Sequence, residues 1–332
     1  MTTFTSTTNG NLADGATYGN TSPGVRGTDF PGDDDVLVVD TGDTVTMDAD
    51  ATIGSVDIKG TLTTDGTART LTLDDGGQGY ICEHRGTVST TINLTINSNY
   101  AGDRLIRLNN GGNGNFNDVS ITLQSSSRKL TIGTEAATIG GNLIITQGEF
   151  NTDSSNNYAL TVAGLCKVYG TLTGNSSTIT VGALHLDGGT YSAPDSSGST
   201  IINDESGNQA FDNDGTFTHN GGTVTISTAG NSQIDWIGTG SGNLNNLTYS
   251  GGAILEWTVN GGTIDGDLSI TNGTLQSSNG NKALTVTGNV IVGDGTGSAN
   301  TAILGNASEE AAQTFGSLTI ASDGKYNATS GT

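Results

Sequence analysis

The chain is poor in charged residues, proline and long apolar runs. Only 13% of its 332 residues are charged, about half of the roughly 25% found in an average soluble domain. No stretch approaches 18 consecutive apolar residues, so no transmembrane helix is expected. The start, Met1–Thr5, has neither the basic nor the apolar part of a classical signal peptide. Proline occurs only 3 times, which disfavours a disordered, Pro-rich chain.

Basic residues are also scarce. The sequence has 11 Lys and Arg against 33 Asp and Glu, a net charge of −22. Such a field repels phosphate backbones and anionic lipid surfaces, so we expect neither a nucleic-acid partner nor membrane insertion. The same charge serves solubility, and ion binding is the alternative use.

Cysteine is nearly absent, and aromatic residues make up 5% of the chain. Cys82 and Cys166 lie far apart in the sequence, without a Cys-x-x-Cys motif or a neighbouring His cluster. We predict two separate buried thiols, with a disulfide or a metal site as the alternative.

Glycine is abundant, at 52 residues, and the apolar residues alternate with polar ones. Leu71-Thr72-Leu73 and Ile121-Thr122-Leu123 are examples of this period of two. No window carries apolar residues at the helical spacing over three turns. The pattern therefore predicts an all-β protein.

Internal repeats indicate which all-β fold this is. Gly141–Phe150 resembles Gly266–Leu275 at an offset of 125 residues, and Ala159–Gly164 resembles Ala283–Gly288 at an offset of 124. The alignment makes two pairs of leucines equivalent: Leu143 with Leu268, and Leu160 with Leu284.

A shorter unit recurs more widely: an apolar residue, Gly, any residue, then apolar-x-apolar. It occurs at Ile53–Ile58, Val181–Leu186 and Phe315–Ile320. A strand this short cannot bury its apolar side alone, whereas stacked coils form one continuous core. We therefore predict a right-handed parallel β-helix (β-solenoid) with an N-terminal capping segment. At roughly 18–25 residues per coil it would have about 12–16 coils. β-Sandwiches remain an alternative, because Asn-Gly and Asp-Gly hairpin signals also occur.

The chain is predicted to divide near residue 32. Residues 1–32 have few alternating apolar positions and are expected to form a cap or an attachment arm, and residues 33–332 the solenoid. Asp195–Thr216, which is rich in Asn, Asp, Ser and Gly, is predicted to be a protruding loop. After the rung Thr314–Tyr326 no capping helix follows. Either the chain continues in the native protein, or another subunit covers this end.

The most distinctive segment is Pro31–Asp48, which reads PGDDDVLVVDTGDTVTMD. It resembles the opening of a broad group of glycine-rich parallel β-helix proteins that includes bacterial surface adhesins and bacteriophage structural proteins. The similar residues cover about 31–74. Leu12 and Tyr18 stand where that group commonly has tryptophan. The resemblance implies a β-helix with a structural or adhesive role.

No nucleophile elbow, P-loop, HExxH motif or EF-hand loop occurs. The three histidines are far apart, and His185, within Leu184-His185-Leu186, is expected to point outward. Clustered carboxylates are candidate calcium ligands, because a hard cation prefers oxygen. The alternatives are turn capping and solvation, or the acid–base pairs of β-helix polysaccharide-degrading enzymes. The candidates for calcium are Asp33, Asp34, Asp35, Asp204, Glu205, Asp212 and Asp214.

Trp236 and Trp257 are separated in the sequence by close to one coil length. With Tyr249 they are predicted to form a carbohydrate-binding platform, and packing in the core is the alternative.

Together these features favour a structural or binding module of a virion or extracellular appendage, without catalysis and with no cofactor beyond possible calcium. We expect it to form a homo-oligomer or to assemble with other virion or appendage subunits. The alternative is a surface adhesin or glycan-binding β-helix, possibly with polysaccharide-degrading activity.

Overall fold

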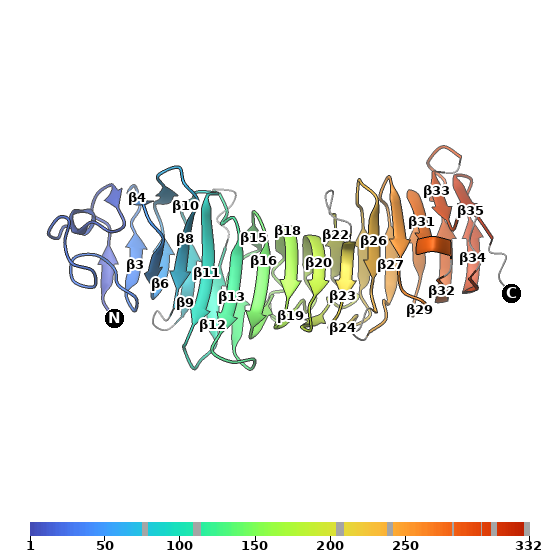
Figure 1. Ribbon diagram of the computed structural model, residues 1–332, viewed down its shortest axis with the longest axis horizontal. Helices are drawn as coiled ribbons and strands as arrows, with labels where there is room; N and C mark the ends of the chain where they lie inside the picture. Colours follow the sequence, from blue (N-terminus) through green and yellow to red (C-terminus); the bar gives the residue numbers. More distant parts are fainter. Residues whose placement is uncertain are drawn as a thin grey trace. The chain divides into compact units, whose positions relative to one another are not determined.

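The predicted fold class is confirmed. In the computed structural model the chain is all-β, and its parallel sheets form a β-solenoid of about 12 turns (Figure 1). The structure describes residues 1–74, 79–108, 114–203, 209–237, 242–280, 282–299, 301–306 and 311–328. Two compact units are present, Met1–Ala163 (unit 1) and Gly164–Thr332 (unit 2).

Unit 1 contains three parallel sheets and one further strand pair. The first sheet has the order β1 (Thr3–Thr5), β3 (Val36–Val39), β6 (Ser55–Ile58), β9 (Tyr80–His84), β12 (Arg104–Arg107), β14 (Lys129–Ile132) and β17 (Glu149–Asn151). The second has the order β2 (Gly10–Asn11), β4 (Thr44–Met47), β7 (Thr61–Thr64) and β10 (Thr87–Val88). The third has the order β5 (Ala51–Ile53), β8 (Arg69–Leu73), β11 (Ile92–Ser98), β13 (Val119–Leu123) and β16 (Leu143–Gln147). The further pair joins β15 (Ala137–Ile139) to the start of β18 (Leu160–Val168), whose last residues belong to unit 2.

Unit 2 repeats the arrangement. One sheet has the order β19 (Thr171–Thr173), β21 (Thr190–Ser192) and β24 (Thr216–Thr218). A second has the order β20 (Thr178–Leu186, its first half), β22 (Ser199–Ile202), β25 (Thr223–Ile226), β27 (Asn246–Tyr249), β30 (Leu268–Ile270), β32 (Leu284–Val292, its second half) and β34 (Gln313–Ile320). A third has the order β20 (its second half), β23 (Gln209–Asn213), β26 (Ser232–Asp235), β28 (Ile254–Trp257), β31 (Gly273–Ser277), β33 (Ala302–Leu304) and β35 (Gly324–Tyr326). β29 (Gly262–Ile264) pairs with the first half of β32, and the 3₁₀ turn η2 (Ser278–Gly280) follows β31.

The core consists of apolar columns that run from coil to coil. Leu94 lies opposite Leu71 on one neighbouring strand and Val119 on the other, and Val119 lies opposite Leu143. All four side chains are buried. Burying one such side chain stabilises the fold by about 1.5–3 kcal/mol. A single strand does not gain this stabilisation, because its apolar side is covered only when a neighbouring coil packs on it.

The repeat alignment is confirmed at the level of single residues. Leu143 and Leu268 are the first residues of β16 and β30, and Leu160 and Leu284 are the first residues of β18 and β32. All four are buried. The sequence repeat therefore reflects equivalent strand positions in the two units.

A ladder of side-chain oxygens runs through unit 2, at the position after Gly in the short repeat for three of its members and after Asn245 for the fourth. The Oδ1 atom of Asn246 accepts a hydrogen bond from the backbone N–H of Asp267 at 2.8 Å, and Oδ1 of Asp267 accepts one from Asn289 at 2.7 Å. Oδ1 of Asn289 accepts from the hydroxyl of Ser317 at 2.7 Å. Asn246 and Asp267 each satisfy a backbone N–H of the next coil with a short acceptor side chain, whereas Ser317 donates its hydroxyl to the coil before it.

The predicted loop Asp195–Thr216 was wrong, because this stretch contains β22 and β23. Inward positions of β23 are filled by Ala210, Phe211 and Asn213, all fully buried. Asn213 is tolerated there since its amide donates to the carbonyl of Trp236 at 2.9 Å and its oxygen accepts from the N–H of Gly215. Composition alone treats such a residue as a loop former, whereas its hydrogen bonds make it part of the core.

The N-terminal segment joins the first coil. β1 pairs with β3, β2 pairs with β4, and the 3₁₀ turn η1 (Gly15–Tyr18) follows. The ring of Tyr18 packs edge-on against Phe4 at 5.8 Å, and its hydroxyl donates to the carbonyl of Leu12. These three side chains are buried. The division at residue 32 stays a prediction.

Candidate functional site

The predicted aromatic platform does not exist on the surface. Trp236, Trp257 and Tyr249 are 1%, 0% and 0% exposed, so they belong to the core of unit 2. The indole N–H groups of Trp236 and Trp257 donate to the backbone carbonyls of Thr263 and Lys282. The prediction was wrong because both side chains point inward; they come from adjacent coils, with Trp257 opposite Ile234 and therefore out of register with Trp236. Each ring instead fills the interior, where large apolar area is most stabilising.

The predicted calcium site at Asp33, Asp34 and Asp35 is also not formed. Asp35 is buried, and its two oxygens accept hydrogen bonds from the backbone N–H groups of Thr2 and Gly32. Asp33 and Asp34 are exposed, and Asp33 pairs with Arg26. Asp35 therefore anchors the N-terminal segment, and although the three aspartates line one hollow, they do not form a group placed to hold a metal ion.

The second predicted calcium cluster is only partly described. Asp204 and Glu205 lie outside the described residues. Asp212 belongs to β23 and Asp214 follows it, both on its outward side. In the part of the chain that the structure describes, no group of three or more His, Cys, Asp or Glu side chains is placed to hold a metal ion.

Asp212 nevertheless marks a polar column on the outward face of unit 2. His185 on β20 lies opposite Asp212 on β23, and Asp212 lies opposite Asp235 at the end of β26. Strand neighbours stand about 4.8 Å apart, so one imidazole and two carboxylates follow each other at one coil per step. The Nε2 atom of His185 is 3.3 Å from the carbonyl oxygen of Gln209. His185 points outward, as the sequence predicted.

The pKa of Asp212 is raised above its ordinary value. Burial is the largest cause, because a partly desolvated carboxylate loses hydration. The negative charges of Asp214, Asp235 and Asp187 raise the pKa further, while His185 lowers it. A proton is therefore held more readily at Asp212 than at an isolated carboxylate.

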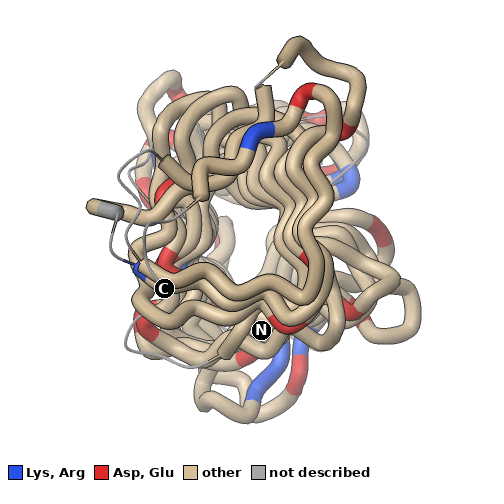
Figure 2. The backbone as a smooth tube through the Cα atoms, turned by 90° about the vertical axis from the view of Figure 1, so that its right-hand side faces the viewer, with Lys and Arg blue, Asp and Glu red and all other residues tan. Residues whose placement is uncertain are grey.

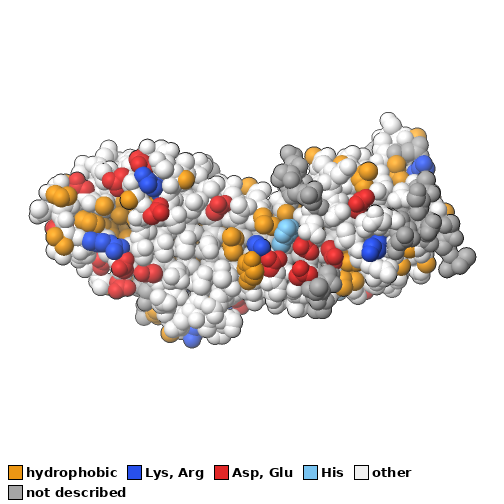
Figure 3. Space-filling model, viewed as in Figure 1, with side chains coloured by type: hydrophobic (Ala, Val, Ile, Leu, Met, Phe, Trp, Pro, Cys, Tyr) orange, Lys and Arg blue, Asp and Glu red, His pale blue; other side chains and the backbone are white. Residues whose placement is uncertain are grey.

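A basic and an aromatic side chain continue this surface. The Nζ atom of Lys167 is 2.7 Å from a carboxylate oxygen of Asp187 and 5.2 Å from the ring centre of Tyr169. The hydrogen bond to Asp187 raises the pKa of Lys167. Tyr169 is 44% exposed, and the ammonium of Lys167 lies over one face of its ring. Figure 3 shows acidic, basic, His and apolar side chains gathered over this part of the molecule.

A second column, next to the first, is built of amides and one carboxylate. In register order it comprises Gln209, Gln233, Glu256 and Gln276, on β23, β26, β28 and β31. The amide of Gln276 donates to Oε1 of Glu256 at 3.1 Å, and the amide of Gln233 donates to Oε2 at 3.4 Å. Glu256 is thereby held between two amides whose own oxygens are left to accept hydrogen bonds from elsewhere.

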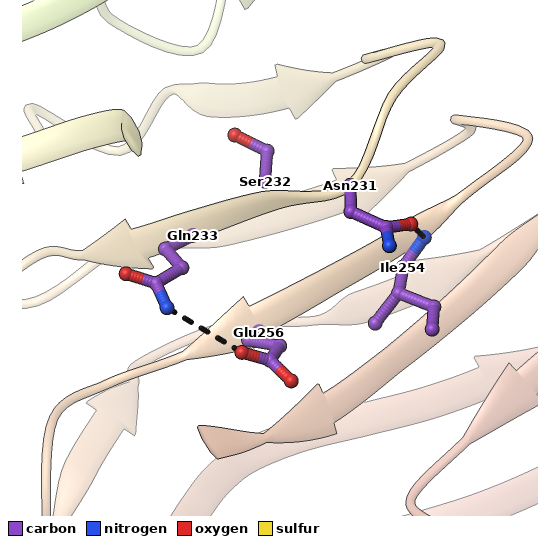
Figure 4. Close-up of a pocket in the computed structure, with 5 residues that line it drawn as sticks. All are labelled: Asn231, Ser232, Gln233, Ile254 and Glu256. Atoms are coloured by element: carbon purple, nitrogen blue, oxygen red, sulfur yellow. Dashed lines mark hydrogen bonds between the residues drawn. The ribbon is translucent and has the colours of Figure 1, made fainter. Parts of the chain in front are cut away.

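A hollow of about 290 Å³ lies against this amide column. Its lining consists of Asn231, Ser232, Gln233, Ile254 and Glu256 (Figure 4). In Figure 4, Gln233 and Glu256 lie next to each other from neighbouring strands, and Asn231 reaches the backbone N–H of Ile254, at 3.1 Å. The hollow offers amide and carboxylate groups beside one aliphatic side chain, a mixture that suits hydroxyl-rich ligands.

Sequence reasoning had singled out only Asp212 and His185 of these two columns. The other members, Asp235, Gln209, Gln233, Glu256 and Gln276, were missed, as was Tyr169 beside them. A spacing signal was present, because the interval from Asp212 to Asp235 is the same as that from Gln233 to Glu256 and equals the local coil length. That length varies along the chain, since Glu256 and Gln276 also lie one coil apart but are closer in the sequence. The sequence therefore did not reveal which residues share a column.

The two cysteines do not belong to either column. Cys82 and Cys166 are both free and buried, as expected. Burial raises the pKa of the Cys166 thiol to about 12 and raises that of Cys82 as well, which makes both poor nucleophiles.

Among the described residues no helix has the length and apolar character needed to cross a membrane.

Comparison with known proteins identified no relative. No protein-family model matches this chain, and no curated protein or solved structure matches it either. The resemblance noted for residues 31–74 is therefore supported only as far as the β-solenoid fold.

Proposed function

We propose that the chain is a structural and binding module of a virion or an extracellular appendage. The observation that carries this proposal is the repeated stacking of short parallel strands on apolar columns, with Thr, Asn, Ser and Gln turned outward. Such a coil stack gives a stiff scaffold in which each coil supports only its neighbours. A net charge of −22 keeps it soluble and apart from nucleic acids and anionic membranes.

Immunogold electron microscopy and mass spectrometry of purified particles and culture supernatant from the source test this role. The protein is expected on virions or surface appendages in stoichiometric amount. A protein confined to the cell interior and absent from every particle would contradict the proposal.

Glycan binding is a second candidate function, and the two outward columns of unit 2 favour it. Amide, carboxylate and imidazole groups are the side chains that hydrogen-bond sugar hydroxyls, and an exposed aromatic ring stacks on the apolar face of a pyranose. Gln233, Gln276 and His185 supply the first kind of contact, and Tyr169 supplies the second. The step of about 4.8 Å between coils is comparable to the length of one sugar in an extended polysaccharide.

The charge of this surface selects among glycans. Asp187, Asp212, Asp235 and Glu256 outweigh Lys167, so uronic acids and sulfated sugars are repelled. The ligand proposed is therefore an uncharged, extended oligosaccharide of hexoses. Its affinity should be modest, because the hollow is shallow and hydroxyl contacts replace contacts with water.

A glycan array followed by calorimetry with the best neutral oligosaccharide tests this candidate. Tyr169→Ala and the double variant Gln233→Ala/Gln276→Ala are each expected to weaken binding by about tenfold or more, equivalent to roughly 1.4 kcal/mol. Tyr100→Ala, which removes a tyrosine of unit 1, should leave binding unchanged. Preferential binding of anionic glycans, or equal binding by all variants, would contradict the assignment.

A further inference from the structure

The first coil of unit 1 supplies a strand to only two of the three sheets. In the coils that follow, the chain passes through the first, second and third sheet in turn, as in β3, β4 and β5. β1 and β2 take the first two of these places in the first coil. The third place falls between β2 and β3, where the chain forms η1 and loops instead (Figure 1). Within the described residues β5 therefore pairs only with β8, and its other edge is open.

This open edge lies within the chain and not at one of its ends. It exists because residues 12–35, between β2 and β3, add no strand to the third sheet. By the same winding, a segment ahead of β1 would belong to an earlier coil. The edge is therefore a property of the described segment itself.

The backbone of Thr52 faces the open edge. The carbonyl oxygen of Ile53 accepts a hydrogen bond from the N–H of Asp74 at 3.0 Å, so it points toward β8. Because successive residues of a strand turn their backbone groups to opposite edges, the N–H and C=O of Thr52 point away from β8. Its carbonyl accepts from Nη2 of Arg26 at 2.7 Å, a side chain that stands where the N–H of a neighbouring strand would lie. The edge thus presents the donor and the acceptor that strand addition uses.

A hollow of about 340 Å³ lies against this edge. Its lining is mostly apolar and consists of Leu12, Ala13, Arg26, Phe30, Pro31, Asp50, Ala51 and Thr52. Ala51 lies opposite Leu71, which in turn lies opposite Leu94 in the apolar core column of the third sheet. Leu71 is fully buried, whereas Ala51 is only half-buried because no strand packs beyond it. The hollow therefore marks the next position of a core column.

The surroundings of the hollow are acidic. Residues 1–52 contain nine aspartates and one arginine, Arg26, which pairs with Asp33. Asp50 is exposed at the hollow, and its Oδ1 accepts from the N–H of Thr70 at 2.8 Å. The whole chain has a net charge of −22, and Figure 2 shows acidic positions in excess of basic ones along the backbone. A second copy of the chain is therefore repelled, whereas a basic partner is attracted.

We propose that the open edge of β5 binds an extended, basic segment of another protein by strand addition. The backbone of that segment pairs with Thr52, and the guanidinium of Arg26 leaves the Thr52 carbonyl and stays with Asp33. One large apolar side chain of the segment enters the hollow next to Ala51, while its lysines or arginines face Asp50. In this mode of binding, main-chain hydrogen bonds give affinity and the side-chain pocket gives specificity. The proposal goes beyond the scaffold role and is independent of glycan binding, which uses unit 2.

Selection of a random linear peptide library on the full chain, followed by fluorescence anisotropy with the synthetic consensus peptide, tests the proposal. The selected peptides are expected to carry a large apolar residue with lysine or arginine beside it. Bound peptide should slow hydrogen exchange at the N–H of Thr52, because that group becomes paired.

Two variants of the hollow separate its apolar and its charged contribution. Ala51→Leu fills the hollow with a side chain of the protein itself and should weaken peptide binding by about tenfold or more. Asp50→Asn keeps the acceptor for the N–H of Thr70 but removes the charge, and should weaken binding by about two- to fivefold.

Each variant has a matched control elsewhere in unit 1. Asp103→Asn changes another exposed aspartate whose Oδ1 accepts a backbone N–H, that of Lys129 at 3.0 Å. Ala101→Leu adds the same bulk at an exposed alanine. Both controls should bind the peptide like the wild type, and all four variants should keep the denaturation midpoint of the wild type.

Three results would overturn the proposal. The first is selection of acidic peptides or of none, and the second is equal binding by the wild type, Ala51→Leu and Asp50→Asn. The third is an N–H of Thr52 that, in the free protein, exchanges as slowly as that of Thr72, because the chain itself would then cover the edge.

Discussion

His185 and Asp212 lie directly opposite each other on the neighbouring parallel strands β20 and β23, with both side chains on the outward face of unit 2. Asp235 follows on the next strand, so two carboxylates and one imidazole occupy successive coils. The pKa of Asp212 is raised by burial and by three neighbouring acids. Replacing Asp212 therefore tests how burial and the neighbouring charges affect stability.

Asp212→Asn is expected to stabilise the protein at neutral pH. Because the folded-state pKa of Asp212 is raised, the folded state binds the proton more tightly than the unfolded state does. Stability should therefore fall as pH rises from the ordinary value of 3.8 through the raised pKa, and stay lower above it. The variant lacks this fall. Denaturant midpoints from pH 3 to pH 8, followed by fluorescence of the two tryptophans of unit 2, measure it.

Asp34→Asn serves as the control, because it removes an exposed carboxylate of unit 1. Its midpoints in unit 2 should follow those of the wild type at every pH. If Asp212→Asn instead lowers stability at neutral pH, the attraction to His185 outweighs burial and repulsion.

His84 predicts the opposite pH dependence in unit 1. The side chain is fully buried next to the ring of Phe116, and burial lowers its pKa. Since the folded state favours neutral histidine, stability is complete above 6.5 and is lost as pH falls from there through the lowered pKa. His84→Gln should remove this acid-induced loss, although it costs about 1 kcal/mol at neutral pH. Amide hydrogen exchange in β9 and β12 measures both effects.

His219→Gln is the matched substitution at a partly exposed histidine, 3.6 Å from Asp265. It should leave exchange in β9 and β12 unchanged across the same pH range. A wild type whose β9 protection from exchange, relative to the unfolded chain at the same pH, is equal at pH 8 and pH 5 would show that His84 is protonated in the fold without penalty.

Trp257 is expected to act as a core residue. Trp257→Phe removes the indole donor to the carbonyl of Lys282 and part of the ring volume, and should cost about 1–3 kcal/mol. Acrylamide quenching of the wild type should be weak, because Trp236 and Trp257 are both at most 1% exposed. Strong quenching, together with an unaltered denaturation midpoint for the variant, would place the ring at the surface.

The ladder of side-chain oxygens predicts which substitutions of Asp267 leave the stability of the protein unchanged. Asp267→Ala leaves the N–H of Asn289 without its acceptor and should cost about 1 kcal/mol. Asp267→Asn should cost almost nothing, because the amide of Asn246 performs the same task one coil earlier. Denaturation midpoints compare the two variants. Equal losses for both would mean that the charge, and not the acceptor geometry, matters.

The amino-acid sequence determined the class of structure. Alternating apolar residues fix which side chains of a short strand can be buried, and the internal repeat matched Leu143 with Leu268 and Leu160 with Leu284, as the strands confirm. It also indicated that His185 points outward and that the two thiols are separate. These properties are local, because they follow from a period of two and from the cost of exposing apolar surface.

Only the tertiary structure decided which residues meet. Coil lengths vary, since the step from Gln233 to Glu256 is longer in the sequence than the step from Glu256 to Gln276, so sequence distance does not give the register between strands. For that reason the sequence did not show that Trp257 lies opposite Ile234 and not opposite Trp236, or that Asp212 and Asp235 form a column. The exposure of Leu318 and Ile320 was likewise invisible in a pattern that marks them as core, because burial depends on whether another coil lies beyond them.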